Sequence, residues 1–409
     1  MNMKKKTLMV VAAGPFQVPG IRRAQSLGYR VIANDANPDA PGLKLADQGY
    51  HLDLQDIAGC IDVARKNSIV GVLTVAADAA VPTVSAVAAA LDLPGVSLEA
   101  AQTAVDKSRM RECFDRCGVP SPKWRQCASL AEAEAAAREL DWPVVVKPAD
   151  NAGSRGVSLV RLAAELAESY KKAHEQSRRG SVMVEEFMPG VEISCELFVY
   201  RGEVFVLGLS DKIRTSPPCL LDTTVLFPSE HSKDIQERAC EVASMAIRAT
   251  AIDMATVHME LMVTNGEVKV VELAARGAGF RVFTDIVPWV TGIDTVEQLI
   301  RLSVGEQPDF SVTQSRAAVL RFPEVKPGVV TSVSGVESAR ALPGIFEASI
   351  NVKPGDIVRP LTSGSDRAGH IIAFAETRAG AVALTRQAEQ RICVRTEPMT
   401  QSKKVTRVS

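Results

Sequence analysis

Short apolar runs alternate with amphipathic stretches over residues 7–100, and this pattern allows few folds. The runs TLMVVAA, YRVIANDA and GVLTVAA have the length and composition of buried strands, and stretches of helical character separate them. Parallel strands need long crossover connections, and the helices in those connections cover both faces of the sheet. The alternation therefore predicts an α/β N-terminal domain, residues 1–100, with a parallel sheet between helices.

Ligands of such a sheet bind at the carboxyl ends of its strands. These ends fall at residues 14–19, 35–37 and 77–78. A dinucleotide is one candidate, because GPFQVPG follows the first strand and Asp35 ends the second. However, the spacing is not GxGxxG, and prolines replace the glycines that let a backbone approach pyrophosphate. A small acidic or amino-containing ligand is the better prediction, and Asp78 is the carboxylate best placed to meet an amine.

The segment VHMELMVTNGEVKVVELAARGAGFR, residues 257–281, predicts a β-hairpin with one carboxylate in each strand. An ionised carboxylate among apolar neighbours is costly unless a cation compensates it. Glu260 and Glu272 would therefore form a cation site, with Arg276 just beyond the second strand. The alternative is a half-exposed hairpin whose two glutamates are simply solvated.

The register of this hairpin decides between the two interpretations. A two-residue Asn-Gly turn would place Glu272 on the face opposite Glu260, because a shift of one residue reverses every side chain. We predict instead a three-residue turn that ends with Gly266 in a left-handed bulge. This register pairs Glu260 with Val270 and His258 with Glu272, so that both carboxylates face the same way.

The amino-acid composition indicates in which cellular compartment the protein is expected and which kinds of partner it is expected to bind. The chain has 409 residues, of which 46% are hydrophobic and 23% charged, as in soluble proteins of roughly two to four domains. Lysine plus arginine (47) balance aspartate plus glutamate (48), so no general attraction to nucleic acid or membrane is expected. The first apolar run is shorter than the roughly 7–15 residues of a signal peptide core. The eight cysteines are scattered without a CxxC, which favours free thiols and a cytoplasmic protein.

The rest of the chain divides into further units. Residues 98–118 are predicted to form one long helix, and residues 120–190 a small α+β lobe in which Ser129 caps a helix. The Pro-rich stretch 214–230 has no period and predicts a lid loop. Short strands with Gly and Pro turns follow. The predicted units are 101–310, a strand-rich C-terminal domain at 311–396, and a disordered tail at 397–409.

A lysine and a small-residue loop suggest a phosphate site in VVVKPADNAGSRGV. Lys147 directly follows a buried strand, and Gly153, Ser154 and Gly156 let backbone N–H groups turn toward an anion. The motif is not a Walker P-loop, because no GKS or GKT opens a helix. Alone, such a motif is more often an ordinary hairpin loop.

A strand end suited to a nucleoside follows in MVEEFMPGVEISCE. Glu185 and Glu186 end an apolar strand, and apolar side chains around Met188 suit a flat heterocycle. Glu192 lies after the turn at Gly190, where it can accept both hydroxyls of a ribose. Without the other motifs, a solvated acidic hairpin would explain this stretch as well.

Together these motifs resemble the ATP-grasp superfamily over about residues 7–310. Lys107 in DKSRMRECFDRCGVPSP, Lys147, the VEEFMPGVE strand and the Glu260/Glu272/Arg276 hairpin occur in the order typical of that family. The resemblance implies a Rossmann-like N-terminal lobe followed by a small and a large lobe that clasp ATP. ELAARGAG and the C-terminal stretches resemble the L-amino-acid ligase branch, although Ala274 stands where many members have a metal-binding asparagine.

The resemblance also implies a role for each position. The phosphate-binding groups would be Lys107, Lys147 and the loop with Gly153, Ser154 and Gly156. The adenine would meet Glu185, Glu186 and the Met188 amide, and the ribose Glu192. Glu260 and Glu272 would bind Mg²⁺, or Mn²⁺, as oxygen ligands. Arg276 would steady the acyl phosphate and its tetrahedral successor.

The implied reaction is ATP-dependent ligation of a carboxylate to an amine. The carboxylate attacks the γ-phosphate with help from Lys147, and an amine attacks the resulting acyl phosphate, giving an amide, ADP and phosphate. Asp78, His258 or a substrate phosphate would accept the proton of the amine. We expect small-molecule substrates, first of all amino acids, and a homodimer. The alternatives are a purine-pathway or carboxylase-type ligase, a non-catalytic ATP-binding protein, and an NAD-dependent oxidoreductase.

Overall fold

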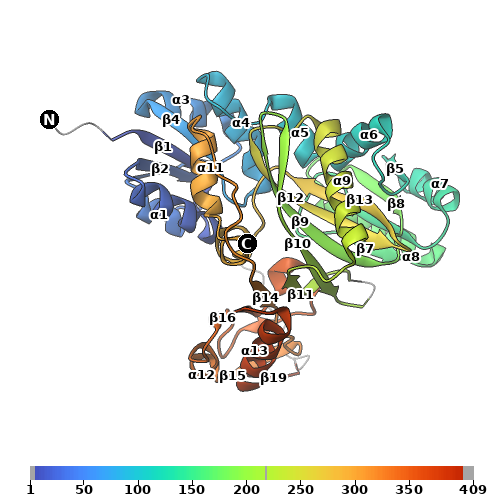
Figure 1. Ribbon diagram of the computed structural model, residues 1–409. Coiled ribbons are helices and arrows are strands. Elements are labelled where there is room, and N and C mark those ends of the chain that lie inside the picture. The colour runs from blue at the N-terminus through green and yellow to red at the C-terminus, as the bar shows by residue number, and fades with distance from the viewer. Residues whose placement is uncertain (1–4, 217–218, 399–409) are drawn as a thin grey trace.

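The computed structural model describes residues 5–216 and 219–398, which fold around four β-sheets. Figure 1 shows the N-terminal sheet on one side, a large curved sheet in the middle and a small lobe on the far side. The C-terminal residues form a domain below the large sheet. The predicted multidomain architecture of α/β and α+β units is confirmed. None of the helices in these residues is long and apolar enough to cross a membrane.

The N-terminal sheet is parallel, as predicted, in the order β3-β2-β1-β4. Its strands are β1 (Thr7–Val11), β2 (Arg30–Asp35), β3 (Gln48–His51) and β4 (Ile69–Leu73). The helical elements between and after them are η1 (Pro15–Gln17), α1 (Val18–Ser26), α2 (Pro41–Leu45), α3 (Ile57–Asn67), η2 (Asp78–Ala80) and α4 (Val81–Ala90). Strand β3 was not predicted, because QGYH at the sheet edge has no apolar run.

The single helix predicted over residues 98–118 is wrong, because the chain breaks at Asp106 into α5 (Leu98–Val105) and α6 (Lys107–Cys117). Asp106 has extended backbone angles, φ −125° and ψ 105°, and its carboxylate accepts the N–H groups of Ser108 and Arg109. Aspartate satisfies the otherwise unpaired donors at a helix start in this way. The break makes Lys107 the first residue of α6.

The small lobe is an antiparallel sheet of order β5-β8-β6-β7, and two helices share its core. Its elements are β5 (Trp124–Cys127), α7 (Leu130–Leu140), β6 (Val144–Pro148), β7 (Ser158–Val160), α8 (Ala163–Gln176) and β8 (Val182–Glu186). The predicted cap is confirmed, since the Ser129 hydroxyl accepts the N–H of Glu132 at 3.2 Å. The loop between β6 and β7 faces the same end of the lobe as Lys147.

The large sheet has eight antiparallel strands in the order β13-β12-β9-β10-β11-β14-β18-β16. The strands are β9 (Val191–Tyr200), β10 (Glu203–Arg214), β11 (Asp222–Phe227), β12 (Ala255–Thr264), β13 (Glu267–Ala274), β14 (Ala317–Arg321), β16 (Ile345–Ile350) and β18 (Gly369–Ala375). Strand β11 occupies residues 222–227 of the stretch predicted as a lid, 214–230, so the prediction is wrong for that part, and residues 217–218 of the stretch lie outside the described chain. The apolar residues VLF of β11 pair with β10 and β14 instead of remaining in a loop.

One face of the large sheet is apolar, and the other carries charged side chains beside apolar ones such as Phe198. The odd-numbered residues of β9, Ile193 to Val199, pack in one core with helix α9 (Lys233–Thr250). Successive side chains of a strand point to opposite faces, so Glu192 and Glu196 project from the other side. We call this side the polar face. It also carries residues of β10, β11 and the β12–β13 hairpin, described below.

The hairpin register differs from the prediction. Thr264 pairs with Glu267, so the turn has two residues, Asn265 and Gly266, both with positive φ (51° and 83°). Such two-residue turns fit the right-handed twist of the strands. The predicted pairs Glu260–Val270 and His258–Glu272 are therefore wrong.

A β-bulge restores the arrangement that the two carboxylates were expected to have. The register shifts between Glu260 and Leu261, so that Glu260 pairs with Glu272 and His258 with Ala274. An extra residue in one strand changes the register in this way. Residues directly opposite each other share a face of the sheet, so the two carboxylates are on one side although the turn is shorter than predicted.

The predicted domain boundary at residue 311 falls inside a continuous structure, because β14, β18 and β16 extend the large sheet. The C-terminal part adds a second sheet of order β17-β15-β19 and two helices. These elements are β15 (Gly328–Ser334), α12 (Val336–Arg340), β17 (Ile357–Val358), η4 (Gly364–Asp366), α13 (Arg378–Arg391) and β19 (Cys393–Glu397). The predicted tail begins within β19, and its residues 399–409 lie outside the described chain.

Residues after the hairpin return to the N-terminal domain. They form the π-helical turn η3 (Val282–Ile286), α10 (Val287–Thr291) and α11 (Thr295–Ser303). Phe283 and Leu299 share a core with Leu8 of β1, and Figure 1 shows α11 against the N-terminal sheet. The N–H of Gly277 donates to the carbonyl of Val75 at 2.9 Å. This packing brings the end of β4 next to the end of β13.

Candidate active site

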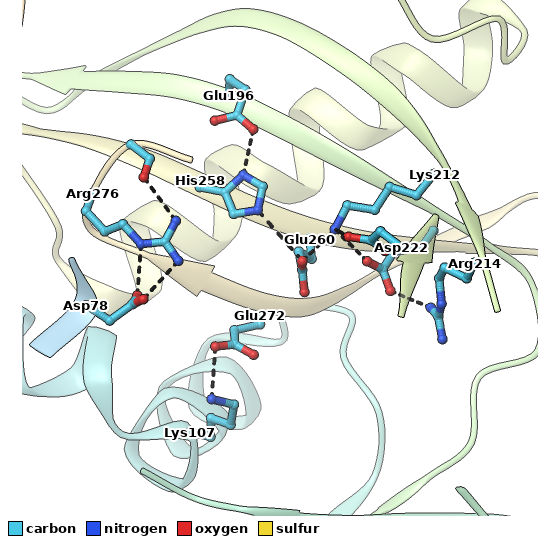
Figure 2. Close-up of polar contacts among 12 residues, drawn as sticks. Asp78, Lys107, Glu196, Lys212, Arg214, Asp222, His258, Glu260, Glu272 and Arg276 are labelled. Carbon is cyan, nitrogen blue, oxygen red and sulfur yellow. Dashed lines mark hydrogen bonds and ion pairs between the residues drawn. The ribbon is translucent and has the colours of Figure 1, made fainter. Parts of the chain in front are cut away.

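Charged side chains gather where the polar face meets the N-terminal domain and the small lobe (Figure 2). They come from η2, α6 and strands β9 to β13. The labelled members are Asp78, Lys107, Glu196, Lys212, Arg214, Asp222, His258, Glu260, Glu272 and Arg276. Nearly all of them form ion pairs with each other, and the pairs define four adjacent groups.

Arg276 and Asp78 form the group closest to the N-terminal domain. Two guanidinium nitrogens of Arg276, Nε and one terminal nitrogen, each donate to a carboxylate oxygen of Asp78 at 3.0 Å. Burial alone would raise the pKa of Asp78, but the guanidinium lowers it below its usual range. Both predicted residues therefore lie together, in a bidentate pair with well-defined geometry.

Lys107 and Glu272 form the second group. The Lys107 ammonium lies 2.9 Å from a carboxylate oxygen of Glu272 and donates to the carbonyl of Asn151 at 2.6 Å. Its backbone N–H also donates to Ala149 at 2.9 Å. The start of α6 thus connects the hairpin to the loop predicted to cover phosphates.

Lys147 belongs to a fully buried triad. Its ammonium lies 2.6 Å from one carboxylate oxygen of Glu185, and Nε of Arg111 lies 2.9 Å from the other. Burial lowers the pKa of Lys147, and Glu185 partly offsets this effect. The Glu185 side chain, predicted to face an adenine, is thus enclosed between two cations. Glu186, half-buried and 3.3 Å from Lys269, is the neighbouring glutamate that faces outward.

The loop after Lys147 has the backbone conformations that its small residues suggested. Gly153, Ser154 and Gly156 have φ of 71°, 58° and 76°. Positive φ is readily adopted by glycine and is uncommon for other residues. The carboxylate of Asp150 anchors the base of the loop by accepting the Ser177 hydroxyl at 2.7 Å. We refer to residues 151–156 as the glycine loop.

Lys212 lies at the centre of the third group, surrounded by three carboxylates. Its ammonium lies 2.7 Å from Glu192, 3.2 Å from Asp222 and 2.5 Å from Glu260, and its side chain is only 3% exposed. Arg214 forms a second ion pair with Glu192. Burial raises the pKa of Glu192 to about 7, with Lys212 opposing the shift and Glu260 adding to it.

The same three carboxylates have the donor chemistry of a divalent cation site. Oxygen atoms of Glu192, Asp222 and Glu260 lie within 4.8 Å of one another. Mg²⁺ and Mn²⁺ prefer carboxylate oxygens, so these residues fit such an ion. Glu272, predicted as the second ligand, is opposite Glu260 across the hairpin but bound to Lys107.

His258 and Glu196 form the fourth group. Nδ1 of His258 lies 2.6 Å from a Glu196 oxygen, and Nε2 lies 3.7 Å from Glu260. Burial would lower the pKa of His258, but the two glutamates raise it to about 9. His258 is therefore an imidazolium at neutral pH, and Glu196 orients its ring.

This shift predicts how stability depends on pH. The pKa of His258 is about 9 in the folded state against 6.5 ordinarily. Between these values the folded state binds more protons than the unfolded state, so the free energy of unfolding falls as pH rises. Full stabilisation by His258 is expected below pH 6.5 and its loss as pH passes through 9. Thermal unfolding midpoints measured across this window should fall less steeply for His258→Gln than for the unchanged protein. Equal slopes would contradict the assignment.

Several residues of the site were not predicted, namely Arg111, Glu196, Lys212, Arg214 and Asp222. A signal for some of them exists in the sequence. Glu196 is a carboxylate inside the apolar strand VEISCELFVY, which is the same anomaly that identified Glu260. Lys212 similarly interrupts the strand EVFVLGLSDKIR. Asp222 has no such signal, because it precedes the apolar residues of its strand and lies in a stretch that the sequence predicts as a loop.

Two family models match separate parts of the chain. The ATP-grasp domain matches residues 140–285, and the L-amino acid ligase C-terminal domain 2 matches residues 321–397. The first match includes the glycine loop, the polar face and Arg276. The second covers most of the part of the chain that follows β14.

Individual proteins show similarity as well. An uncharacterised protein of Sinorhizobium fredii is 30% identical over 299 residues, 72% of this chain and 62% of that protein. Alanine–anticapsin ligase of Bacillus subtilis is 28% identical over 236 residues, 52% of this chain and 49% of that protein. The alignments thus span about half to three-fifths of these relatives' lengths.

A solved structure extends the similarity to the whole fold. The L-amino acid ligase from Bacillus licheniformis superposes with a TM-score of 0.84 at 21% identity, covering 97% of this chain and 100% of that one. The chain therefore matches an ATP-grasp domain over residues 140–285 and an L-amino acid ligase C-terminal domain 2 over residues 321–397, on the fold seen in an L-amino acid ligase.

Proposed function

We propose that this protein is an ATP-dependent ligase that joins the carboxylate of an amino acid to an amine through an acyl phosphate, releasing ADP and phosphate. The observation that carries the proposal is the convergence of three ion pairs. They are Lys107–Glu272, Lys212–Glu260 and Arg276–Asp78. The matches to an ATP-grasp domain and to an L-amino acid ligase C-terminal domain support the same chemistry. Substrate identity, as amino acids, is an inference from the similarity to L-amino acid ligases.

The small lobe and the start of α6 would hold the nucleotide. Lys107 and Lys147 would bind phosphate oxygens as point charges, and N–H groups of the glycine loop would add neutral donors. Glu186 and the backbone of Met188 would meet the adenine, and Glu192 the ribose. In this proposal the Glu185 carboxylate keeps Lys147 in position and does not contact the base.

Glu260 and Glu272 would hold Mg²⁺ or Mn²⁺, with the oxygens of Glu192 and Asp222 close to Glu260. When bound, the ion would neutralise charge on the phosphates during transfer. The positive charge of Lys212 now compensates these carboxylates. The methyl side chain of Ala274 offers no ligand oxygen at the position where the ATP-grasp resemblance implies an asparagine.

The charge states limit the choice of proton acceptor. Asp78 has a lowered pKa and stays ionised, so it suits the binding of an ammonium group and is a weak base. The pKa of His258 is about 9, so the ring already carries its proton at neutral pH. We therefore favour an oxygen of the substrate phosphate, the third candidate, as the acceptor of the amine's proton. Arg276 would stabilise the oxyanion of the tetrahedral species.

Phosphate release provides the test. The protein is incubated with ATP, Mg²⁺ and all pairwise mixtures of the twenty amino acids, and the products are identified by mass spectrometry. We expect phosphate release that requires both amino acids, together with a dipeptide mass. Glu272→Ala should abolish this release while the protein remains folded. No phosphate release in any mixture would contradict dipeptide ligation. Unchanged turnover of Glu272→Ala would contradict the assignment of Glu272 as a metal ligand.

A further inference from the structure

A segment of the C-terminal domain reaches the mouth of the site. It comprises residues 361–367, between β17 and β18, and includes the short helix η4. A Cβ placed on Gly364 would lie 3.9 Å from the carbonyl oxygen of Gly153, so this segment borders the glycine loop. The carboxylate of Asp366 fixes the segment by accepting the N–H groups of Thr362 and Ser363 at 3.1 and 2.8 Å.

Arg367, the last residue of the segment, projects toward the polar face. Its guanidinium carbon lies 3.7 Å from the ring centre of Phe322 and 4.9 Å from that of Phe280. One terminal nitrogen donates to the backbone carbonyl of Asp222 at 2.8 Å. Asp222 is also a partner of Lys212, so Arg367 borders the carboxylate group. The two rings hold the guanidinium by cation–π contact.

Arg367 differs from the other cations of the site in having no carboxylate partner. Among the described residues, no aspartate or glutamate oxygen lies within 4.0 Å of its guanidinium, and its buried Nε has no hydrogen-bond acceptor. By contrast, Lys107, Lys147, Lys212 and Arg276 are each paired with a carboxylate. A buried donor without a partner is costly. The Arg367 guanidinium therefore keeps hydrogen-bonding capacity that no carboxylate of the described residues uses.

We propose that Arg367 binds the carboxylate of the amine substrate and so makes the C-terminal domain part of the specificity site. This inference rests on the proposed ligase function. A planar guanidinium matches a carboxylate with two parallel hydrogen bonds. In the proposed function, Lys107, Lys147 and the glycine loop bind the phosphates. Arg367 packs instead against aromatic rings, which suit contact with an organic substrate. Phe280 continues this apolar surface to Phe16 of the N-terminal domain, with ring centres 5.4 Å apart.

The experiment compares each active amine from the amino-acid mixtures with its α-carboxamide, which lacks the negative charge. In the unchanged protein the KM of the amino acid should be much lower than the KM of its amide. Arg367→Met should raise the KM of the amino acid about 10- to 100-fold, the range expected for loss of charge-assisted hydrogen bonds. The KM of the amide and the KM of ATP should stay the same. For Arg367→Lys the KM of the amino acid should lie between those of the unchanged protein and of Arg367→Met, because lysine keeps the positive charge but lacks the two parallel donors of the guanidinium.

The control is Arg386→Met, which removes an exposed arginine from α13 of the same domain and should change none of these values. A merely structural role of Arg367 would lower activity with amino acid and amide alike, and that result would overturn the inference. A rise in the KM of ATP alone would also overturn it and assign Arg367 to a phosphate. Absence of ligation in the unchanged protein would instead contradict the proposed function itself, and the inference would fall with it.

Discussion

Arg276→Met is expected to lower kcat for ligation about 100- to 1000-fold, the usual loss when one preorganised donor to an oxyanion is removed. Asp78 already holds the guanidinium in place, because Nε and one terminal nitrogen of Arg276 each donate to a carboxylate oxygen of Asp78 at 3.0 Å. Because the guanidinium is held in place before the reaction, it need not reorient when the oxyanion forms. Such preorganisation is the physical source of large effects on kcat. The measurement is phosphate release at saturating ATP and amino acids. Arg276→Lys should remain impaired, because an ammonium lacks the planar fork.

A second variant separates catalysis from disturbance of the site. Arg276→Met leaves Asp78 ionised and without its counter-charge, which could itself displace neighbouring groups. The double variant Asp78→Asn/Arg276→Met removes that charge and keeps the shape of the side chain. If Arg276 stabilises the oxyanion, the double variant should remain as slow as the single one. Recovery of kcat to within a few-fold of the unchanged protein would show that the loss came from the unpaired carboxylate.

Local sequence was sufficient to predict most elements and several of the charged residues that the fold brings together. Alternation of apolar runs and helices predicted the N-terminal sheet, and Ser129 predicted the start of α7, because these features depend on neighbouring residues. An ionised carboxylate in an apolar strand identified Glu260 and Glu272 for an energetic reason that holds in any fold. The order of the motifs along the chain then indicated the family.

Features that depend on distant strands could not be predicted in the same way. The bulge beside Glu260 is a feature of the pairing between β12 and β13, and periodicity along one strand does not reveal it. The ion pair between Lys147 and Glu185 joins neighbouring strands of the small lobe. Sequence alone therefore associated Glu185 with a nucleotide, whereas the fold encloses its side chain between cations.

The predicted division at residue 311 stays a prediction, but the strand pairing that crosses it depends on distant strands in the same way. Residues 311–396 have short strands and frequent turns, as an independent domain would. However, β14 pairs with β11, so the C-terminal strands continue the large sheet. The unexpected strand β11 carries Asp222 to the polar face, and the carbonyl of that residue meets Arg367. One misjudged stretch thus concealed both a site residue and the connection to the C-terminal domain.

Glu185→Ala is expected to lower the stability of the small lobe by about 3–5 kcal/mol, the usual cost of leaving buried charges without their partner. Arg111, Glu185 and Lys147 have side-chain exposures of 1%, 5% and 6%. Removal of the glutamate would leave two buried cations beside each other. Trp124 pairs with Glu185 on the adjacent strand, so urea unfolding followed by tryptophan fluorescence reports on this lobe.

The adjacent glutamate provides the matched control. Glu186 is 24% exposed and lies 3.3 Å from a partly exposed Lys269, and such pairs contribute at most about 1 kcal/mol. Glu186→Ala should therefore shift the urea midpoint only slightly. Glu185→Gln, which keeps the shape and one acceptor but removes the charge, should be nearly as destabilising as Glu185→Ala if charge dominates. Equal small shifts for all three variants would show that water reaches Lys147 and Arg111 and solvates them. In that case Lys147 would not depend on Glu185 for its position, and its assignment as a preorganised phosphate ligand would need another source of support.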